Sequence, residues 1–327
     1  MKYRALLGLI GIVLISAALT SCGPSYEPMG PSTTNPHIDG DNFVARDGVR
    51  LPVSVWGPRE RPKIVVVALH SFGEFRSAYA LIGENLAKRD IAVWAYDQRG
   101  FGDAPHRGVW SGTETMIQDL QDFVSAVQSS SGIETPVVLL GESMGAAVVL
   151  GALADPNAIM PHAVILSGPG VREDRPWRYW FNVGLWIATR IAPGFEVKVE
   201  REYDSRLDDI HASRWAEDSR IIHRVRLDTY YGLIQLSDFA SSAAQSLEAK
   251  TLVLYGTKDD QIHPQSICAL MKRLGNHGSL QVFEDNPHLM FQVRDQMTTL
   301  SLINQWIDRP GQLSRPSQDM PCELQTR

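Results

Sequence analysis

A serine lies between two apolar stretches in residues 136–153, PVVLLGESMGAAVVLGAL. The run before the serine is too short for a helix and suits a buried parallel strand, whereas the run after it suits a buried helix. Residues 141–145 match the G-x-S-x-G pattern, which holds a nucleophilic serine on a sharp turn between a strand and a helix. Gly141 and Gly145 leave room where that strand and helix nearly touch. The sequence therefore predicts Ser143 as a nucleophile, against the alternative of a glycine-rich turn that merely contains serine.

A serine hydroxyl needs a base and an orienting acid, and candidates for both follow later in the chain. Asp259 and Asp260 come after the strand-like segment 251–255, and His288 comes after the strand-like segment 280–283. The carboxyl ends of strands form the edge where open α/β sheets place their sites. We expect His288 to accept the serine proton and one of the two aspartates to orient the imidazole ring.

Such a triad also needs hydrogen-bond donors for the oxyanion of a tetrahedral intermediate. One predicted donor is the backbone N–H of Met144, directly after the nucleophile. The second is the backbone N–H of Phe72, in a loop that follows the strand-like segment 63–69. His70 begins this loop, and we expect it to brace the loop through hydrogen bonds. His263 shares a loop with the aspartates, which favours a surface position over a role as base.

These motifs together resemble one branch of a known family. The loop 70–73 (HSFG), Tyr79, residues 95–102 (AYDQRGFG), the turn at Ser143 and the loops that hold Asp259 and His288 resemble the bacterial monoacylglycerol lipases and lysophospholipases among the α/β-hydrolases. The resemblance extends from about residue 43 to residue 306 and includes residues 226–238. It implies an α/β-hydrolase fold, a mostly parallel, doubly wound sheet with a helical cap insertion.

The resemblance also bears on individual residues of the predicted site. When the family's G-x-x-D loop is laid on the sequence without a gap, Asp259 falls on the catalytic acid. An alternative alignment through residues 260–264 (DQIHP) resembles the D-x-I-x-P loops of other hydrolases and would select Asp260. Ser71 stands where many relatives have glycine, which leaves the backbone geometry of the oxyanion loop open, because serine tolerates positive φ poorly.

The amino terminus predicts export and lipid attachment. Residues 1–4 are short and basic, residues 5–19 are almost entirely apolar, and small residues follow, as in a secretory signal peptide. Residues 19–22 (LTSC) resemble the lipobox of bacterial lipoproteins, which implies that residues 1–21 are a signal peptide and that Cys22 receives a lipid. The residue after Cys22 is Gly23 and not an aspartate that would resemble an inner-membrane retention signal, so we expect the periplasmic face of the outer membrane.

The rest of the chain divides into a tether, one domain and a tail. Residues 22–37 are rich in Pro, Ser, Thr and Gly and predict the lipidated cysteine and a flexible tether. Residues 38–308 predict the α/β-hydrolase domain, with a hairpin at Asp47-Gly48 and a cap at about residues 171–249. Residues 309–327 show no periodicity and predict a loose tail.

The predicted cap contains an unusually apolar segment, with no charged residue between Arg178 and Arg190. Two alternatives remain for its aromatic side chains. They could pack against the other helices of the cap, as aromatic stripes usually do in a core. One face could instead line an acyl-chain tunnel or touch lipid. In either case an apolar lid over Ser143 suits a lipid ester better than a small polar one.

Charge and cysteine content narrow the possible partners. A formal net charge of −6 without basic runs argues against nucleic acid and against a polybasic membrane patch. If Cys22 is lipidated, Cys268 and Cys322 remain in an oxidising compartment and could form a disulfide or stay as two free thiols. No His, Cys or Asp cluster has metal-ligand spacing and no glycine-rich phosphate loop is present, so no cofactor is implied.

Together these features predict a membrane-tethered serine hydrolase with a Ser143-His288-Asp259 triad and an acyl-enzyme intermediate. Its expected substrate is a carboxylic ester of a single-chain glycerolipid, either a monoacylglycerol or a lysophospholipid. Two alternatives remain open: a short-chain carboxylesterase or peptidase with the same triad, and a non-catalytic envelope protein that binds lipid.

Overall fold

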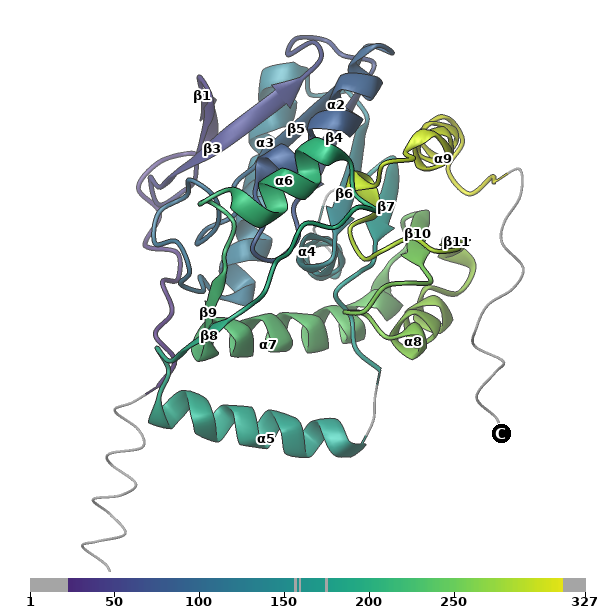
Figure 1. Ribbon diagram of the computed structural model, residues 1–327. Coiled ribbons are helices and arrows are strands. Elements are labelled where there is room, and N and C mark those ends of the chain that lie inside the picture. The colour runs from purple at the N-terminus through teal and green to yellow at the C-terminus, as the bar shows by residue number, and fades with distance from the viewer. Residues whose placement is uncertain (1–22, 156–157, 159, 174–175, 314–327) are drawn as a thin grey trace, which may run out of the picture.

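The computed structural model describes residues 23–155, 158, 160–173 and 176–313 (Figure 1). They form a nine-stranded sheet in the order β1-β2-β3-β5-β4-β6-β7-β10-β11. All pairs from β5 to β11 are parallel, and the pairs that involve β1, β2 or β3 are antiparallel. The strands are β1 His37–Asp39, β2 Asn42–Val44, β3 Arg50–Trp56, β4 Ile64–Leu69, β5 Ile91–Tyr96, β6 Val137–Glu142, β7 Ala163–Ser167, β10 Thr251–Gly256 and β11 Gly278–Phe283.

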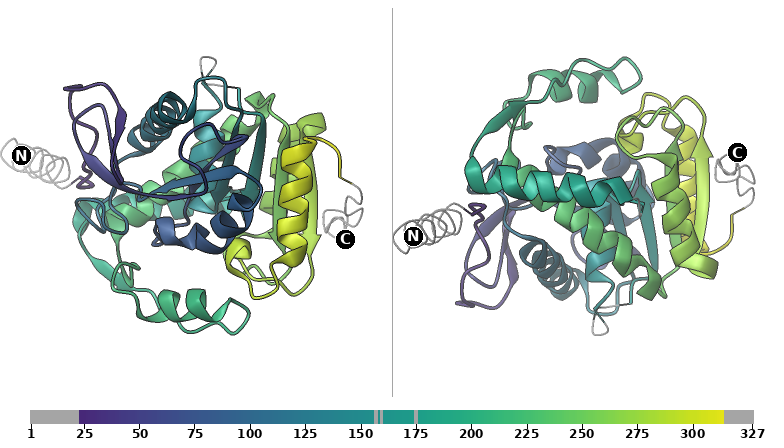
Figure 2. Two further views of the ribbon diagram at one scale, coloured as in Figure 1. Left: turned by 90° about the horizontal axis from the view of Figure 1, so that it is seen from above. Right: turned by 90° about the horizontal axis from the view of Figure 1, so that it is seen from below.

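Helices cover both faces of the sheet (Figures 1 and 2). The α-helices are α2 Ala80–Ala87, α3 Thr113–Ser131, α4 Met144–Ala152, α5 Pro176–Ile191, α6 Asp209–Glu217, α7 Leu227–Ala243, α8 Pro264–Leu274 and α9 Met297–Asp308. Short 3₁₀ turns are η1 Arg76–Tyr79, η2 Ala244–Ser246, η3 Gly275–His277 and η4 Met290–Gln292. This arrangement confirms the predicted α/β-hydrolase architecture.

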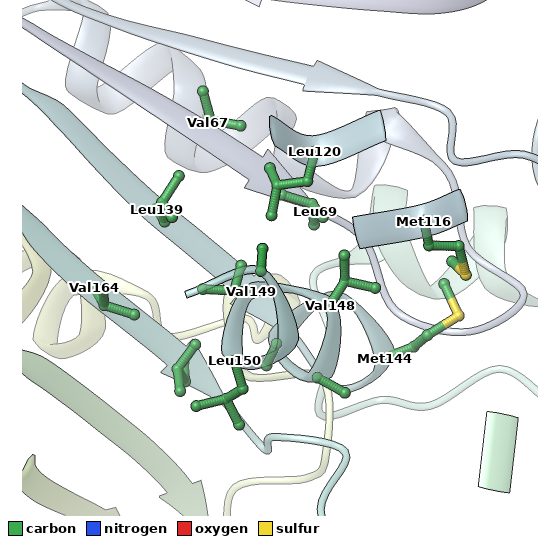
Figure 3. Packing of buried hydrophobic residues seen from close by; sticks show 14 of the residues in the cluster. Val67, Leu69, Met116, Leu120, Leu139, Met144, Val148, Val149, Leu150 and Val164 are labelled. Atoms are coloured by element: carbon green, nitrogen blue, oxygen red, sulfur yellow. The ribbon is translucent and has the colours of Figure 1, made fainter. Parts of the chain in front are cut away.

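The central strands are continuous runs of Val, Ile, Leu and Ala because both of their faces are buried. One core joins the sheet to α3, α4, α7 and α8, and the other joins the opposite face to α2 and α9. Figure 3 shows α4 in the first core, with its valines Val148 and Val149 beside residues of the strands and of α3. This packing fixes α4, and with it the turn at its amino end.

The amino-terminal hairpin forms where the sequence predicts it. β2 pairs with β3 so that Val44 lies opposite Arg50, and Gly48 in the connecting turn has a φ of 84°. A positive φ is readily adopted by glycine, because glycine has no Cβ atom. The hairpin extends the sheet from β3 to its edge.

The segment predicted as a flexible tether is instead fixed to the domain over most of its length. The N–H of Ser25 donates to Asp228 (3.1 Å), the N–H of Glu27 to the carbonyl of Trp110 (2.9 Å) and the N–H of Met29 to the hydroxyl of Thr115 (3.0 Å). Strand β1 also begins at His37, inside the predicted tether. Composition alone was misleading because the hydrogen-bond partners lie far away in the sequence.

The insertion between β7 and β10 divides into two parts. The first part contains α5, α6 and a two-stranded sheet of β8 Glu196–Lys198 and β9 Arg224–Arg226, and it lies outside the main layers (Figures 1 and 2). The second part, α7, packs on α4, and its residues Leu236 and Ala240 are fully buried in the core. The predicted cap boundary at residue 249 therefore includes a helix of the main domain.

Several predicted features fall outside the described residues, among them the signal peptide 1–21, Cys22, and Cys322 with the tail from residue 314 onward. Cys268, on α8, is disulfide-bonded. Within residues 23–313, apart from the undescribed gaps, no helix is long and apolar enough to span a membrane.

Candidate active site

Ser143 lies on the predicted turn, between the end of β6 at Glu142 and the start of α4 at Met144. Its backbone has φ 53° and ψ −111°, a strained conformation for a residue with a side chain. The N–H of Ser143 donates to the carbonyl of Ser167 (2.9 Å), and the N–H of Gly170 donates to the carbonyl of Ser143 (2.9 Å). These two bonds, from the segment after β7, hold the turn in place.

The two glycines of the motif allow close backbone contact. A Cβ atom on Gly141 would lie 2.6 Å from the backbone of Ala146, and one on Gly145 would lie 2.1 Å from the carbonyl oxygen of Leu69. Neither distance is possible between real atoms, and both obstacles are backbone. The glycines are therefore needed so that α4 can start directly above the strand ends.

The structure brings His288 and Asp259 into direct contact. Nδ1 of His288 lies 2.7 Å from Oδ2 of Asp259, and the two side chains are only 3% and 0% exposed. The other carboxylate oxygen of Asp259 accepts the N–H groups of Gln261 and Ile262, each at 2.9 Å. The neighbouring Asp260 is exposed. The geometry therefore favours Asp259 over Asp260 as the partner of the histidine.

His288 also lies close to the end of β7 that supports Ser143. A Cβ atom on Gly168 would approach Nδ1 of His288 to 2.9 Å, so this glycine, with φ 44°, makes room for the ring. Nε2 of His288 is buried and has no hydrogen-bond partner among the described residues. Because Asp259 occupies Nδ1, Nε2 is the nitrogen that remains for a substrate or a nucleophile.

Two ionisable groups near Ser143 have shifted pKa values. Burial lowers the pKa of His288, but the hydrogen bond and negative charge of Asp259 outweigh burial and leave that pKa above its ordinary value. Burial raises the pKa of Glu142 to about 7, although the N–H of Phe291 and the charge of His288 oppose the shift. Glu142 is fully buried and directly precedes the serine.

The loop predicted to supply the oxyanion donor is fixed by His70. Nδ1 of this buried ring lies 2.9 Å from the carbonyl oxygen of Ser71, and Nε2 accepts the N–H of Gln98 (3.0 Å). Burial lowers the pKa of His70 to about 4, so the ring is neutral near pH 7 and donates from Nδ1. The ring therefore braces the loop, as the sequence predicts.

In this loop Gly73 has a positive φ of 78° and Ser71 does not. Serine at position 71 is therefore compatible with the backbone geometry of the loop. Phe72 packs edge-on against Phe101, with ring centroids 5.4 Å apart. Met144 is the first residue of α4, so its N–H has no acceptor within the helix. Neither the N–H of Phe72 nor that of Met144 donates to another described residue.

His263 is exposed at the start of α8, whereas the ring of His288 is buried. In the described part of the chain, no group of three or more His, Cys, Asp and Glu residues could hold a metal ion.

The sequence did not reveal a buried network next to the site. Glu74, two residues after Phe72, forms an ion pair with Arg214 on α6, and Arg214 also donates to Gln292 (2.7 Å). The available signal was an acidic residue directly after the predicted oxyanion loop. Its partner, however, lies 140 residues away in the sequence.

Comparisons with known proteins agree with this geometry. The model of the Hydrolase_4 family, described as serine aminopeptidase, S33, matches residues 60–295. Monoacylglycerol lipase of Mycolicibacterium smegmatis is 27% identical over 292 residues, which cover 85% of this chain and 99% of that protein. Monoglyceride lipase of Rattus norvegicus is 34% identical over 284 residues, which cover 83% and 91%.

Solved structures share the fold. A soluble variant of monoglyceride lipase from Saccharomyces cerevisiae, in complex with a substrate analog, superposes with a TM-score of 0.69 at 18% identity, and covers 88% of this chain and 100% of that one. Monoacylglycerol lipase of Paleococcus ferrophilus gives a TM-score of 0.63 at 20% identity and covers 79% and 98%. The chain thus belongs to the Hydrolase_4 family and is a serine ester hydrolase of the monoacylglycerol lipase-like α/β-hydrolases.

Proposed function

We propose that this enzyme hydrolyses the ester bond of single-chain glycerolipids at a membrane, through a triad of Ser143, His288 and Asp259. The observation that carries the proposal is the 2.7 Å contact between His288 and Asp259. Gly168 lies beside His288 and Gly170 beside the strained Ser143, and Nε2 of the histidine has no partner among the described residues. A base oriented by a buried acid beside a serine on such a turn is suited to acyl transfer.

In the proposed reaction, the hydroxyl oxygen of Ser143 attacks the ester carbonyl carbon while its proton passes to Nε2 of His288. Asp259 keeps the second ring proton on Nδ1 and stabilises the imidazolium that forms. The N–H groups of Phe72 and Met144 donate to the negatively charged oxygen of the tetrahedral intermediate. Collapse of the intermediate expels the alcohol, which takes the proton from His288. Water then hydrolyses the acyl-enzyme by the same path and restores the serine.

The cap supports a lipid substrate. Most large apolar side chains of α5 are solvent-exposed, and the exposed fractions of Trp177, Trp180 and Ile191 are 55%, 71% and 70%. This exposure disfavours the alternative that these side chains fill the core of the cap. Such an exposed apolar surface is typical of a site that contacts lipid or another apolar partner. The relatives named monoacylglycerol lipase and monoglyceride lipase give the same indication.

The proposed location is the bacterial cell envelope, with a lipid on Cys22 and the outer membrane's periplasmic face as the favoured site. The support is the signal-like segment and the lipobox-like residues 19–22. A lipid anchor would keep the enzyme beside a substrate that partitions into the bilayer.

The first test is Ser143→Ala, since alanine fits the turn but has no hydroxyl. We expect turnover of a p-nitrophenyl ester to fall by several orders of magnitude and labelling by a fluorophosphonate probe to disappear, with an unchanged thermal melt. A mutant with near wild-type turnover would remove Ser143 from the mechanism.

The second measurement is a panel of monoacylglycerols, lysophospholipids and aminoacyl p-nitroanilides. The specificity constant should rise about fourfold for each buried methylene until the acyl site is full, since one methylene contributes about 0.8 kcal/mol. A preference for acetyl esters would indicate a short-chain esterase. A preference for the anilides would indicate the peptidase activity named in the family description.

A further inference from the structure

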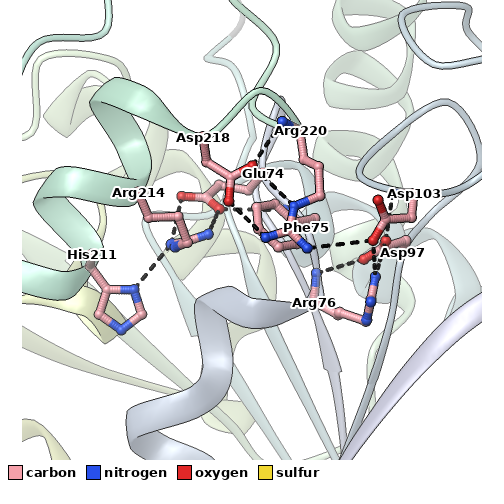
Figure 4. A network of polar contacts seen from close by, with 9 residues as sticks. All are labelled: Glu74, Phe75, Arg76, Asp97, Asp103, His211, Arg214, Asp218 and Arg220. Carbon is pink, nitrogen blue, oxygen red and sulfur yellow. Dashed lines mark hydrogen bonds and ion pairs between the residues drawn. The ribbon is translucent and has the colours of Figure 1, made fainter. Parts of the chain in front are cut away.

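One arginine of the cap is buried against the candidate active site. Arg214, on α6, has a side chain that is only 9% exposed. Figure 4 shows it directed from α6 toward Glu74 and Phe75, with His211 on its other side. Burial of a guanidinium costs free energy unless its hydrogen-bond donors and its charge are satisfied. Nε of Arg214 has no partner among the described residues, whereas its two terminal nitrogens contact Glu74, Gln292 and His211. The partners of these terminal nitrogens are therefore informative.

The first partner directly follows the proposed oxyanion loop. Both terminal nitrogens of Arg214 donate to the carboxylate of Glu74, whose side chain is fully buried. The guanidinium also lies 5.1 Å from the ring centroid of Phe75. A two-branched pair of this kind fixes the carboxylate in both position and orientation. Glu74 is two residues beyond Phe72, so the pair fixes the end of the loop that carries the proposed oxyanion donor.

The second partner belongs to the segment that follows the candidate base. Nη2 of Arg214 donates to Oε1 of Gln292 (2.7 Å), and Nε2 of Gln292 donates to Glu142 (3.1 Å). Glu142 directly precedes Ser143. One guanidinium therefore connects, through two fully buried side chains, the oxyanion loop, the segment after His288 and the strand end that carries the serine.

The cap segment that leads into α6 is itself paired with the segment after His288. Leu207 forms an antiparallel bridge with Val293, in which the N–H of Asp208 donates to the carbonyl of Gln292 (2.9 Å) and the N–H of Arg294 donates to the carbonyl of Arg206 (3.0 Å). Two backbone contacts thus reinforce the side-chain contact from Arg214. In contrast with the exposed face of α5, this part of the cap is bound to the site at several points.

We propose that Arg214 is a positioning residue, which holds the oxyanion loop and the segment after His288 in register with Ser143. The inference rests on the proposed function, because it assigns Arg214 a role in the same reaction. Arg214 acts through Glu74 and Gln292 and not by contact with the reacting atoms. Since misplacement of catalytic groups by about 1 Å costs on the order of 100-fold in rate, loss of this arginine should lower turnover more than substrate binding.

The chain offers a matched control, Arg220. This arginine lies on the ring of Phe75 as Arg214 does, at 4.3 Å, but it pairs with Asp218 and Asp103 and its side chain is 35% exposed (Figure 4). Its loss removes a similar cation from the same aromatic ring without touching Glu74 or Gln292. It therefore separates the specific contacts of Arg214 from a general need for a cation beside Phe75.

The experiment compares wild type, Arg214→Met, Arg214→Lys, Glu74→Gln and Arg220→Met on p-nitrophenyl butyrate, a soluble ester that needs no membrane. We expect Arg214→Met to lower kcat and the rate of fluorophosphonate labelling on the order of 10- to 100-fold, with KM changed less than about threefold. Arg214→Lys should recover part of the loss, because lysine keeps the charge but not the planar fork. Arg220→Met should stay within about twofold of wild type.

Equal kcat in wild type and folded Arg214→Met would overturn the proposal, and so would an equal loss in Arg220→Met. If Arg214→Met does not fold, Glu74→Gln decides, since it keeps the size of the side chain: a kcat within about twofold of wild type would then overturn the proposal. Failure of the proposed function gives a different result, because wild type itself would then neither turn over the ester nor react with the probe.

Discussion

At the scale of single residues, the candidate site depends on groups held in unfavourable states. Ser143 has a positive φ, and strain of this kind costs about 1–3 kcal/mol in a residue with a side chain. The side chains of His288 and Asp259 are almost fully buried, so a charge on either one is stabilised by the other. The surrounding strands and glycines must therefore stabilise a geometry that these residues would not adopt alone.

The two adjacent aspartates give a sharp comparison. Asp259 orients His288 in the structure, whereas Asp260 is exposed. We expect Asp259→Asn to lower kcat on the order of 10⁴-fold, since the amide would favour the wrong tautomer of the ring, and Asp260→Asn to change it little. Steady-state kinetics on a p-nitrophenyl ester measure both. The reverse result would mean that the alignment through residues 260–264, which selects Asp260 as the catalytic acid, is the correct one.

The pH dependence follows from His288, because the proposed base must be neutral to accept a proton. Asp259, Glu142 and Asp260 are the charged groups that raise its pKa, so kcat/KM should fall with decreasing pH at a midpoint above the ordinary histidine value of about 6.5. Glu142→Gln removes one of these negative charges and should move the midpoint to lower pH. Profiles from about pH 5 to 9 measure both midpoints. A shift to higher pH in Glu142→Gln would contradict this assignment.

At the scale of secondary-structure elements, the predictions are most accurate where the hydrophobic pattern and the functional residue lie in the same element or directly next to it. The strand-like segments 63–69, 251–255 and 280–283 match β4, β10 and β11 to within a residue or two, because strands in a sheet covered on both faces are rich in apolar residues. The sequence could not show that α7 belongs to the main domain and α5 to the cap, because both helices are apolar. The apolar side chains of α7 contact α4, whereas most large apolar side chains of α5 are exposed. The partner of Arg214 was equally hidden, because only the fold brings α6 to Glu74.

The exposed face of α5 makes a prediction that separates lipid contact from chemistry. Trp180→Glu should weaken binding to lipid vesicles about tenfold or more, since a buried aromatic side chain contributes about 1.5–3 kcal/mol. Turnover of soluble p-nitrophenyl butyrate should not change. Met297→Glu on α9 is the matched control, because Met297 is 74% exposed and Trp180 is 71% exposed. Vesicle sedimentation gives the affinities, and equal binding by the two variants would exclude α5 as the lipid-contacting surface.

At the scale of the whole molecule, the fixed amino-terminal segment relates the proposed anchor to the cap. Ser25 is hydrogen-bonded to Asp228, and the N–H of Asp228 donates to the carbonyl of Pro193 (3.1 Å), just beyond the end of α5. The described chain therefore begins beside that end of α5 (Figures 1 and 2). Cys22 is three residues before Ser25, a span of about 10 Å when extended. A lipid on Cys22 would hold the exposed face of α5 close to the bilayer.

This relation leads to the prediction for Cys22→Ser. The variant should still be exported, because the apolar segment before residue 22 is unchanged, but it should receive no lipid. Wild type should fractionate with membranes and require detergent for release, since two or three acyl chains anchor a protein stably where one chain binds only reversibly. The variant should be soluble, bind vesicles only through α5, and keep wild-type turnover of soluble esters, because the residues of the candidate site lie in the folded domain.

Metabolic labelling with a clickable fatty acid measures the modification directly. Label on wild type and none on Cys22→Ser is the expected result. Trp180→Glu serves as the control, because it removes the other proposed lipid contact and should leave the label in place. Equal label on wild type and Cys22→Ser would contradict the anchor. A wild-type protein found entirely in the soluble periplasmic fraction would do the same, and vesicle contact would then depend on α5 alone.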